Sequence, residues 1–222
     1  MLVFNFVIIE TMTKYANLKE EKSCWRKGYR AVVGLDEAGR GPIAGPVVAA
    51  AVMLKPNSKI LSLKLKDSKK LTARKREELY GVLTNSPGVC WGVGLVSEKI
   101  IDKINILQAT KLAMLRAVAD LKIKNKKKKI DFLILDGNMK LNSVILQKSI
   151  VKGDEKVFSC AAASILAKVT RDRLMEKFDR KYPDYGFLKH KGYPTAFHIK
   201  RLEKHGPCSI HRKTFWPVRK YV

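Results

Sequence analysis

Residues 31–54 read AVVGLDEAGRGPIAGPVVAAAVML, a stretch in which two apolar runs flank a connection rich in glycine and proline. The first run, from Ala31 to Leu35, ends at the acids Asp36 and Glu37, and the second covers Val47–Leu54. Glycine and proline clusters between apolar runs are typical of turns. The pattern therefore predicts an antiparallel pair of strands joined by a turn-rich connection.

Strand and helix patterns interleave along the rest of the chain, and no repeat is visible. Short apolar or alternating runs predict further strands over 89–96, 130–135 and 144–151. Apolar residues at helical spacing predict a helix after the N-cap Thr72, one over 106–121, a long one from Glu155, and a short one near 197–202. Interleaved elements of both kinds indicate an α/β fold with a mixed sheet.

The chain has 222 residues, of which 46% are hydrophobic, enough for one domain with a sizeable core. Lys and Arg number 45 against 20 Asp and Glu, so the formal net charge is +25. Such a charge favours a polyanionic partner, most often nucleic acid, although a basic solvated surface is an alternative. No run approaches the ~20 apolar residues of a membrane helix. The apolar start at residues 3–9 lacks a basic leader, so we expect a cytoplasmic protein without membrane association.

Two features predict no specific chemistry. Cys24, Cys90, Cys160 and Cys208 are widely spaced and form no CxxC pattern, which excludes a zinc finger or a disulfide scaffold. Cys160 falls in a small-residue apolar stretch that is typical of a core. Residues 122–129 contain six lysines, which we interpret as a solvated loop.

Acidic residues punctuate the predicted elements: Asp36 and Glu37 end one apolar run, Asp136 ends another, and Asp154 precedes the long helix. Side chains at strand ends of α/β sheets converge where ligands bind. Taken singly, Asp136 is also typical of a turn and Asp154 of a helix cap. Four carboxylates brought together would repel one another unless a hard divalent cation such as Mg²⁺ lay between them.

This combination of a basic surface and an acidic cluster indicates an enzyme acting on phosphodiesters. Two metal ions roughly 4 Å apart would activate water and stabilise the leaving oxygen. Successive side chains of a strand point to opposite faces, so Asp36 and Glu37 can share one site only if the strand ends or bends there. The turn at Ala38–Gly39 permits that bend.

Between about Tyr29 and Val218 the sequence resembles the ribonuclease HII family, the type 2 ribonucleases H. Six blocks follow the family's order: Gly34–Pro42, Asp67–Leu71, Ile104–Thr110, Leu135–Asn138, Lys152–Asp154 with Cys160–Ile165, and His190–Tyr193 with His211–Arg212. The chain departs from many relatives at Cys160, Pro194 and Trp216, none of which matches a metal ligand. Pro42, directly after the Gly39-Arg40-Gly41 turn, favours ribonuclease HII over its sister family, ribonuclease HIII.

The resemblance implies a ribonuclease H-like fold, with a mixed central sheet flanked by helices and a small C-terminal helical segment. The catalytic domain would cover 29–222, with a substrate-binding segment from about 182 to 222. Residues 1–28 would form an N-terminal appendage, too short for the extra domain of ribonuclease HIII.

The resemblance also implies an endoribonuclease that hydrolyses the RNA strand of RNA–DNA hybrids. It would cut 5′ of single ribonucleotides in duplex DNA, as in ribonucleotide excision repair, leaving 5′-phosphate and 3′-hydroxyl ends. Asp36, Glu37, Asp136 and Asp154 match the family's metal-binding catalytic acids, which use Mg²⁺ or Mn²⁺. The expected partners are RNA–DNA hybrid and ribonucleotide-containing duplex DNA, bound by a monomer.

Substrate recognition is implied for a second group of residues. Gly39, Arg40 and Gly41 match the turn that reads the ribose 2′-hydroxyl, the group that distinguishes RNA from DNA. Tyr193 matches the residue that stacks on the neighbouring deoxyribose; the alternative is an ordinary loop or core aromatic. Lys69, Lys70 and Lys191 are candidate phosphate contacts, although solvated lysines are an equal alternative.

Two other functions fit parts of the pattern. A non-catalytic nucleic-acid-binding protein on the same fold would share the charge, but the presence of all four acids argues against it. Another nuclease or strand-transfer enzyme of ribonuclease H-like architecture would share the acids, but not the Gly39-Arg40-Gly41 turn and the Tyr193 block.

Overall fold

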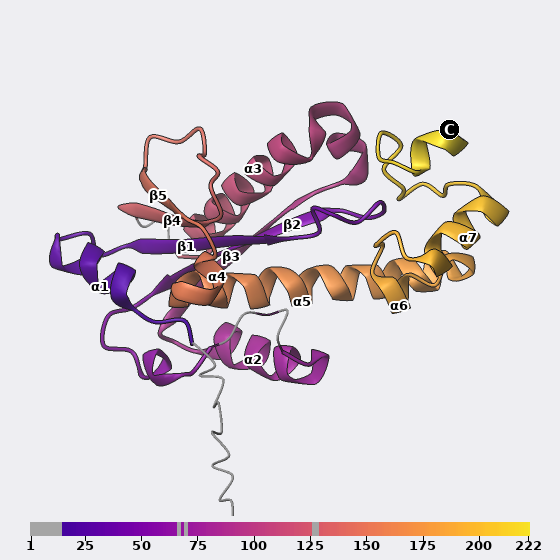
Figure 1. Cartoon of the computed structure of the whole chain (residues 1–222). Helices are drawn as coiled ribbons and strands as arrows, with labels where there is room; N and C mark the ends of the chain where they lie inside the picture. Colours follow the sequence, from indigo (N-terminus) through magenta and orange to yellow (C-terminus); the bar gives the residue numbers. More distant parts are fainter. Residues whose placement is uncertain (1–14, 66–67, 69–70, 126–128) are drawn as a thin grey trace, which may run out of the picture.

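A computed structural model describes residues 15–65, 68, 71–125 and 129–222, and the apolar start at residues 3–9 lies outside this range. Five strands form one sheet in the order β3-β2-β1-β4-β5 (Figure 1). β2 runs antiparallel to β1 and β3, whereas β4 runs parallel to β1 and β5. The strands are β1 (Val32–Ala38), β2 (Val47–Leu54), β3 (Val89–Val96), β4 (Phe132–Asp136) and β5 (Leu146–Ile150). The predicted mixed sheet is confirmed.

Helices cover both faces of the sheet: in Figure 1, α3 lies above it and α5 below it. The α-helices are α1 (Lys19–Arg26), α2 (Ala73–Asn85), α3 (Glu98–Lys124), α4 (Gly153–Lys156), α5 (Phe158–Lys181), α6 (Phe187–His190) and α7 (Ala196–His205). Short 3₁₀ turns are η1 (Lys59–Ser62), η3 (Pro183–Tyr185) and η4 (Val218–Tyr221).

The small residues of β2 are explained by its position between two helical layers. All eight of its residues are buried. Ala49 and Ala51 belong to the core that α3 covers, and Ala50 and Val52 belong to the core that α5 covers. Because successive strand residues face opposite sides, a strand covered on both faces is apolar throughout.

Glycine allows α5 to approach β1 closely. A Cβ atom on Gly34 would lie 2.5 Å from the backbone carbonyl carbon of Ser159, a separation that real Cβ atoms do not show. On the other face, Gly92 and Gly94 of β3 pack against the backbone of α3 in the same way. The sheet therefore holds both flanking helices at short range.

The predicted helices exist, but two of their boundaries differ. The long helix starts at Phe158 rather than Glu155, because Val157 is extended (φ −113°, ψ 122°) and bridges to Asn17. The helix predicted over 106–121 begins earlier, at Glu98. Non-helical backbone at Asn105 kinks it, and the Asn105 side chain accepts the Gln108 amide at 3.1 Å, in the manner of an N-cap.

Other local predictions can be compared directly with the structure. Thr72 caps α2 by accepting the Lys75 amide, as predicted. The lysine tract at 122–129 begins inside the last turn of α3, which ends at Lys124, so its first residues are helical rather than loop. The interpretation of 126–128 lies outside the described residues.

The first described residues pack on the sheet body. The Ala16 amide donates to the Leu65 carbonyl, and Glu21 of α1 is 1% exposed. The Glu21 carboxylate accepts the Ser159 amide at 2.7 Å, at the start of α5. Residues 15–28 are thus anchored beside the N-terminal end of α5.

The C-terminal segment carries the chain back to the end of β1 and β2 (Figure 1). The carboxylate of Asp102, on α3, accepts the backbone amides of Lys213 and Thr214 at 2.9 and 3.0 Å. Ala44, in the connection between β1 and β2, forms an antiparallel bridge with His211. These bonds fix the segment against the connection that begins at the Gly39-Arg40-Gly41 turn.

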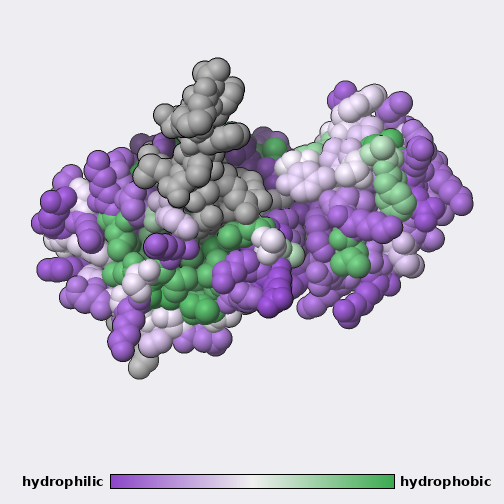
Figure 2. Space-filling model, turned by 60° about the horizontal axis from the view of Figure 1, so that its bottom comes forward, coloured by the Kyte–Doolittle hydropathy of each residue, from purple (hydrophilic) through white to green (hydrophobic). Residues whose placement is uncertain are grey.

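The surface agrees with the polar composition. In Figure 2, hydrophilic residues cover most of the visible face and surround an apolar area. None of the helices in the described part of the chain has the length and apolar character needed to cross a bilayer.

We expect Gly34→Ala to lower the free energy of unfolding by about 1–3 kcal/mol, because the new methyl group would push α5 away from β1. Gly81→Ala is the matched control. Gly81 lies within α2 and a Cβ there meets nothing within 4 Å, so alanine should stabilise by about 0.5–1 kcal/mol. Urea unfolding of both variants measures the two effects. Equal stability of Gly34→Ala and the wild type would contradict this account of the packing.

Candidate active site

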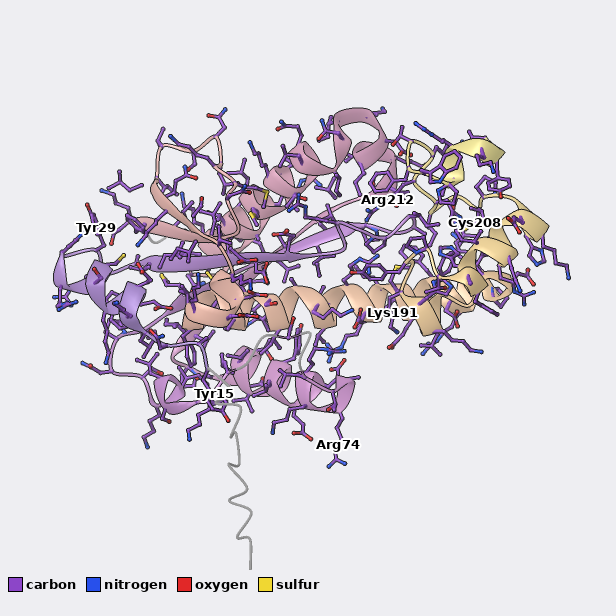
Figure 3. All side chains as sticks on the ribbon, viewed as in Figure 1. Tyr15, Tyr29, Arg74, Lys191, Cys208 and Arg212 are labelled. Carbon is purple, nitrogen blue, oxygen red and sulfur yellow. The ribbon has the colours of Figure 1, made fainter. Side chains whose placement is uncertain are left out.

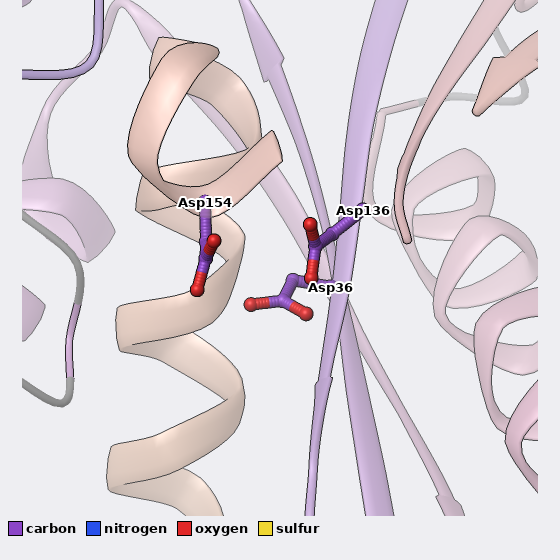
Figure 4. A group of neighbouring side chains, drawn as sticks. All are labelled: Asp36, Asp136 and Asp154. Carbon is purple, nitrogen blue, oxygen red and sulfur yellow. The ribbon is translucent and has the colours of Figure 1, made fainter. Parts of the chain in front are cut away.

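Three carboxylates from three elements meet beside the N-terminal part of α5. Asp36 lies in β1, Asp136 at the end of β4, and Asp154 in α4. One carboxylate oxygen from each lies within 4.8 Å of the others. In Figure 4 the three side chains point toward one another, Asp154 from the helix side and the others from the strands. We call this group the acidic triad.

Backbone geometry holds the triad in place. The parallel pairing of β1 and β4 puts their carboxyl ends side by side. The Asp136 carboxylate accepts the Gly153 amide at 2.6 Å, which ties the start of α4 to the end of β4. Lys152 precedes that amide in a left-handed conformation (φ 58°) and turns the chain from β5 toward the strands. This sharp turn is what brings Asp154 to the sheet.

The triad is electrostatically costly. Asp36 is 4% exposed. Burial, together with the negative charges of Glu37 and Asp136, holds the pKa of the Asp36 carboxyl well above its ordinary value. Hydrogen bonds from the Ser164 side chain and the Glu37 amide oppose this shift without cancelling it.

These residues fit a divalent cation. Ionised carboxylates are hard oxygen donors of the kind that Mg²⁺ and Mn²⁺ prefer. A cation among the triad would remove the repulsion that raises the pKa of Asp36. The donor set and its spacing are therefore consistent with a divalent metal site at Asp36, Asp136 and Asp154.

Glu37 lies next to the triad and outside it. The strand does not end between Asp36 and Glu37: β1 continues to Ala38, where the turn begins, and pairs Asp36 with Ala50 and Glu37 with Ala49. Continuous strand geometry sends adjacent side chains in different directions. The Glu37 carboxylate lies 3.4 Å from the Arg40 guanidinium and lines the neighbouring pocket.

That pocket, of about 450 Å³, gathers most of the predicted substrate-binding residues. Gly39, Arg40 and Gly41 form one wall, and Tyr193 joins them from the C-terminal segment. A Cβ on Gly41 would lie 3.4 Å from the Tyr193 ring, so glycine lets the ring and the turn come together. Tyr193 is 45% exposed, which excludes the alternative of a core aromatic.

Helix α5 supplies residues that the sequence patterns did not single out. Ser164, Lys168 and Arg171 follow one another at helical spacing and all line the pocket. Ser164 bonds Ser68 at 2.8 Å, and Arg76 of α2 completes the basic side. The detectable signal was a polar stripe at i, i+4 and i+7 in the mostly apolar first half of α5.

Of the three predicted phosphate contacts, Lys191 lies within the described residues. Lys69 and Lys70 lie outside the described residues. Lys191 directs its ammonium group to Glu176, 3.3 Å away, and its side chain is 18% exposed. An ion pair with α5 therefore already engages Lys191 in this structure.

The cysteines take no part in the site. All four are free thiols, and Cys160 is fully buried in the core, as predicted. Burial raises the pKa of the Cys160 thiol well above its ordinary value, so it is protonated at neutral pH.

Comparison with known proteins gives a consistent result. The family model "Ribonuclease HII" matches residues 33–218. A ribonuclease HII from Acetivibrio thermocellus is 53% identical over 196 residues, covering 88% of this chain and 73% of that protein. One from Chlamydia caviae is 49% identical over 202 residues, covering 91% and 92% respectively.

A solved structure extends the likeness to the fold. The ribonuclease H2 from Pyrococcus horikoshii OT3 is 29% identical, with a TM-score of 0.69 over 86% of this chain and 96% of that chain. The family match therefore covers the sheet, the acidic triad and the pocket. This protein belongs to the ribonuclease HII family.

Proposed function

We propose that this protein is a metal-dependent endoribonuclease that hydrolyses the RNA strand of RNA–DNA hybrids. We extend the proposal to incision on the 5′ side of single ribonucleotides in duplex DNA, which leaves 5′-phosphate and 3′-hydroxyl ends. The observation that carries it is the acidic triad, within 4.8 Å, beside a pocket walled by the Gly39-Arg40-Gly41 turn and Tyr193.

In this proposal Asp36, Asp136 and Asp154 hold the divalent cations, Mg²⁺ or Mn²⁺, and Glu37 assists from the pocket side. When bound, such ions activate water for attack on the phosphodiester and neutralise the leaving oxygen. Asp36 accepts the Glu37 amide at 2.7 Å and Asp136 accepts the Gly153 amide at 2.6 Å. These bonds fix the donors in advance, so little reorganisation is needed during the reaction.

The pocket wall supplies the preference for ribonucleotides. A turn flanked by glycines brings backbone groups close to the sugar, where the 2′-hydroxyl is the only group that separates RNA from DNA. The ring of Tyr193, exposed beside Gly41, can lie flat against the adjoining deoxyribose. Turn and ring together would select the RNA–DNA junction.

Basic residues hold the phosphate backbone. Arg40, Arg76 and Lys168 line the pocket, within a chain of net charge +25. A non-catalytic binding protein would share this charge but would gain nothing from the triad. Bringing three carboxylates together costs folding free energy, which a bound cation offsets.

Mg²⁺ should raise the midpoint of thermal unfolding by roughly 5–10 °C at a hundredfold excess over its Kd. Asp136→Asn should raise the midpoint without metal, because one repelling charge is lost, and should remove most of the response to Mg²⁺. Differential scanning calorimetry measures both effects, with the exposed Asp184→Asn as the control. An unchanged Mg²⁺ response in Asp136→Asn would exclude the triad as the metal site.

The proposed activity is tested with a DNA duplex that carries one ribonucleotide. With Mg²⁺ or Mn²⁺ we expect incision 5′ of the ribonucleotide, and none with chelator. Asp36→Asn or Asp136→Asn should lower the rate by roughly 10²–10³-fold, because each removes a donor to ions that supply several kcal/mol. Asp184→Asn should cut at the wild-type rate. If the wild type leaves the duplex intact, the proposed function is wrong.

Tyr193→Ala should lower kcat/KM on the single-ribonucleotide duplex by about tenfold, equivalent to roughly 1.4 kcal/mol, and should affect a long RNA–DNA hybrid less. Tyr193→Phe keeps the ring and should retain most of the activity. Trp216→Ala removes another exposed aromatic ring of the C-terminal segment and serves as the control. Equal losses on both substrates in Tyr193→Ala would argue against junction reading by this residue.

A further inference from the structure

Two arginines are buried behind the pocket wall. Arg171 of α5 is 1% exposed, and Arg212 of the C-terminal segment, labelled in Figure 3, is 0% exposed. Within the described ranges, no carboxylate forms an ion pair with either guanidinium. A buried cation without an ionic partner is expensive, so its remaining contacts must compensate.

Backbone carbonyl oxygens provide those contacts. Arg212 donates to the carbonyls of Gly39, Arg40 and Gly45 at 2.6, 3.0 and 2.9 Å. Arg171 donates to the carbonyls of Ala44, Pro46 and Lys191, at 2.9–3.1 Å. Five of the six acceptors therefore belong to the connection between β1 and β2.

The three bonds of Arg212 orient the peptides of the turn. In a trans peptide the C=O and N–H bonds point in opposite directions. The Gly39 and Arg40 carbonyls point inward to the buried guanidinium, so the following amides, on Arg40 and Gly41, point away from it. The outward side is the pocket, whose wall these residues form.

The two amides are available to a ligand. Among the hydrogen bonds of the described residues, none uses the backbone N–H of Arg40 or Gly41 as donor. Each of these N–H groups shares its peptide with a carbonyl that accepts a charge-assisted bond from Arg212. Such a bond polarises the peptide and makes its N–H a stronger donor. The left-handed φ of Gly39 (99°) gives the backbone the bend that this arrangement requires.

We propose that Arg212 is a positioning residue for sugar recognition: its guanidinium fixes the 39–41 turn so that the Arg40 and Gly41 amides face the ribose. This inference rests on the proposed function. Arg212 itself does not touch the substrate. It acts through the two peptides whose carbonyls it binds, and it determines the direction of their amides.

A lysine cannot replace this arrangement. The guanidinium is planar and presents its donors as a rigid fork, and Arg212 uses three of them on three separate carbonyls. Burial lowers the pKa of Arg212 to about 9, which leaves it cationic at neutral pH. An ammonium group at the end of a flexible chain keeps the charge but loses the fixed geometry.

The test compares affinities rather than cleavage rates. In the inactive Asp136→Asn background with Mg²⁺, Kd is measured for a duplex with one ribonucleotide and for the same duplex made only of DNA. We expect the ratio of the two Kd values to fall by about tenfold when Arg212→Lys is added, the loss expected for one or two hydrogen bonds. Affinity for the all-DNA duplex should change little.

The control is Arg219→Lys, an exposed arginine of the same segment, which should keep the full ratio. A purely structural Arg212 would lower the thermal midpoint or the active fraction but leave the ratio unchanged, and that result would overturn the inference. A different result would overturn the proposed function rather than this inference. In that result Asp136→Asn, with Arg212 intact, shows no preference for the ribonucleotide duplex, and the wild type does not cut that duplex.

A second measurement uses the unaltered turn and does not depend on how the Arg212 variant folds. In NMR spectra of the Arg212-containing protein, the Arg40 and Gly41 amide protons should exchange rapidly with solvent. They should shift downfield with the ribonucleotide duplex but not with the all-DNA duplex. Amides protected from exchange in the free protein would contradict the outward orientation.

Discussion

The close packing of α5 on β1 is the contact on which the site depends. Gly34 carries no side chain where it meets Ser159, so the helix lies directly on the strand that bears Asp36. From there Ser164, Lys168 and Arg171 follow at helical spacing along the pocket. Ser164 bonds Ser68 at one end of this stripe, and seven residues later, about 10 Å along the axis, Arg171 holds the β1–β2 connection. One helix thus sets the distance between the acidic triad and the Gly39-Arg40-Gly41 turn.

The molecule stabilises its buried charges in two opposite ways. The guanidiniums of Arg171 and Arg212 are fully engaged with carbonyl oxygens, so their charge is satisfied within the protein. The triad brings three carboxylates together, and burial, with the negative charges of Glu37 and Asp136, raises the pKa of Asp36. A buried cation bound by carbonyl oxygens makes a rigid support, whereas clustered carboxylates make a site with affinity for a cation from outside. The charges of the two arginines thus support the fold, whereas the charges of the three carboxylates suit metal binding.

Much of the fold was predictable because its signals are local. A continuous apolar run identifies β2, alternating apolar residues identify β3, and Thr72 identifies the start of α2. The triad was predictable because acids at element ends converge in α/β sheets. The prediction failed where tertiary pairing overrides the local pattern: Val157 bridges to Asn17, and the long helix starts after it.

The supports of the pocket were not predictable from local patterns. Arg171 and Arg212 bind carbonyl oxygens, which every residue has, so no sequence signature marks their partners. Five of the six partners also lie more than 120 positions away along the chain. Burial of an arginine is visible only once the layers are assembled. The sequence identifies the turn and Tyr193, but the reason why they hold their geometry appears only in three dimensions.

The adjacent residues His211 and Arg212 link the two parts of the pocket wall. The carbonyl oxygen of Tyr193 lies 2.9 Å from Nδ1 of His198. Because a carbonyl oxygen can only accept, this nitrogen must be the donor. Burial lowers the pKa of His198 to about 3 and of His211 to about 4, so both rings are neutral. His198 Nε2 therefore accepts from His211 Nε2, 3.0 Å away, and His211 Nδ1 accepts the Cys208 amide.

Every ring nitrogen in this chain of bonds thus has one role, and the chain runs in one direction, from Cys208 to Tyr193. The next residue, Arg212, holds the Gly39-Arg40-Gly41 turn from behind. A single pair of neighbouring residues thus anchors both the backbone of Tyr193 and the turn. His211 and Arg212 are joined covalently, so a displacement of this segment would move Tyr193 and the turn together. The distance between Tyr193 and the turn would therefore change little.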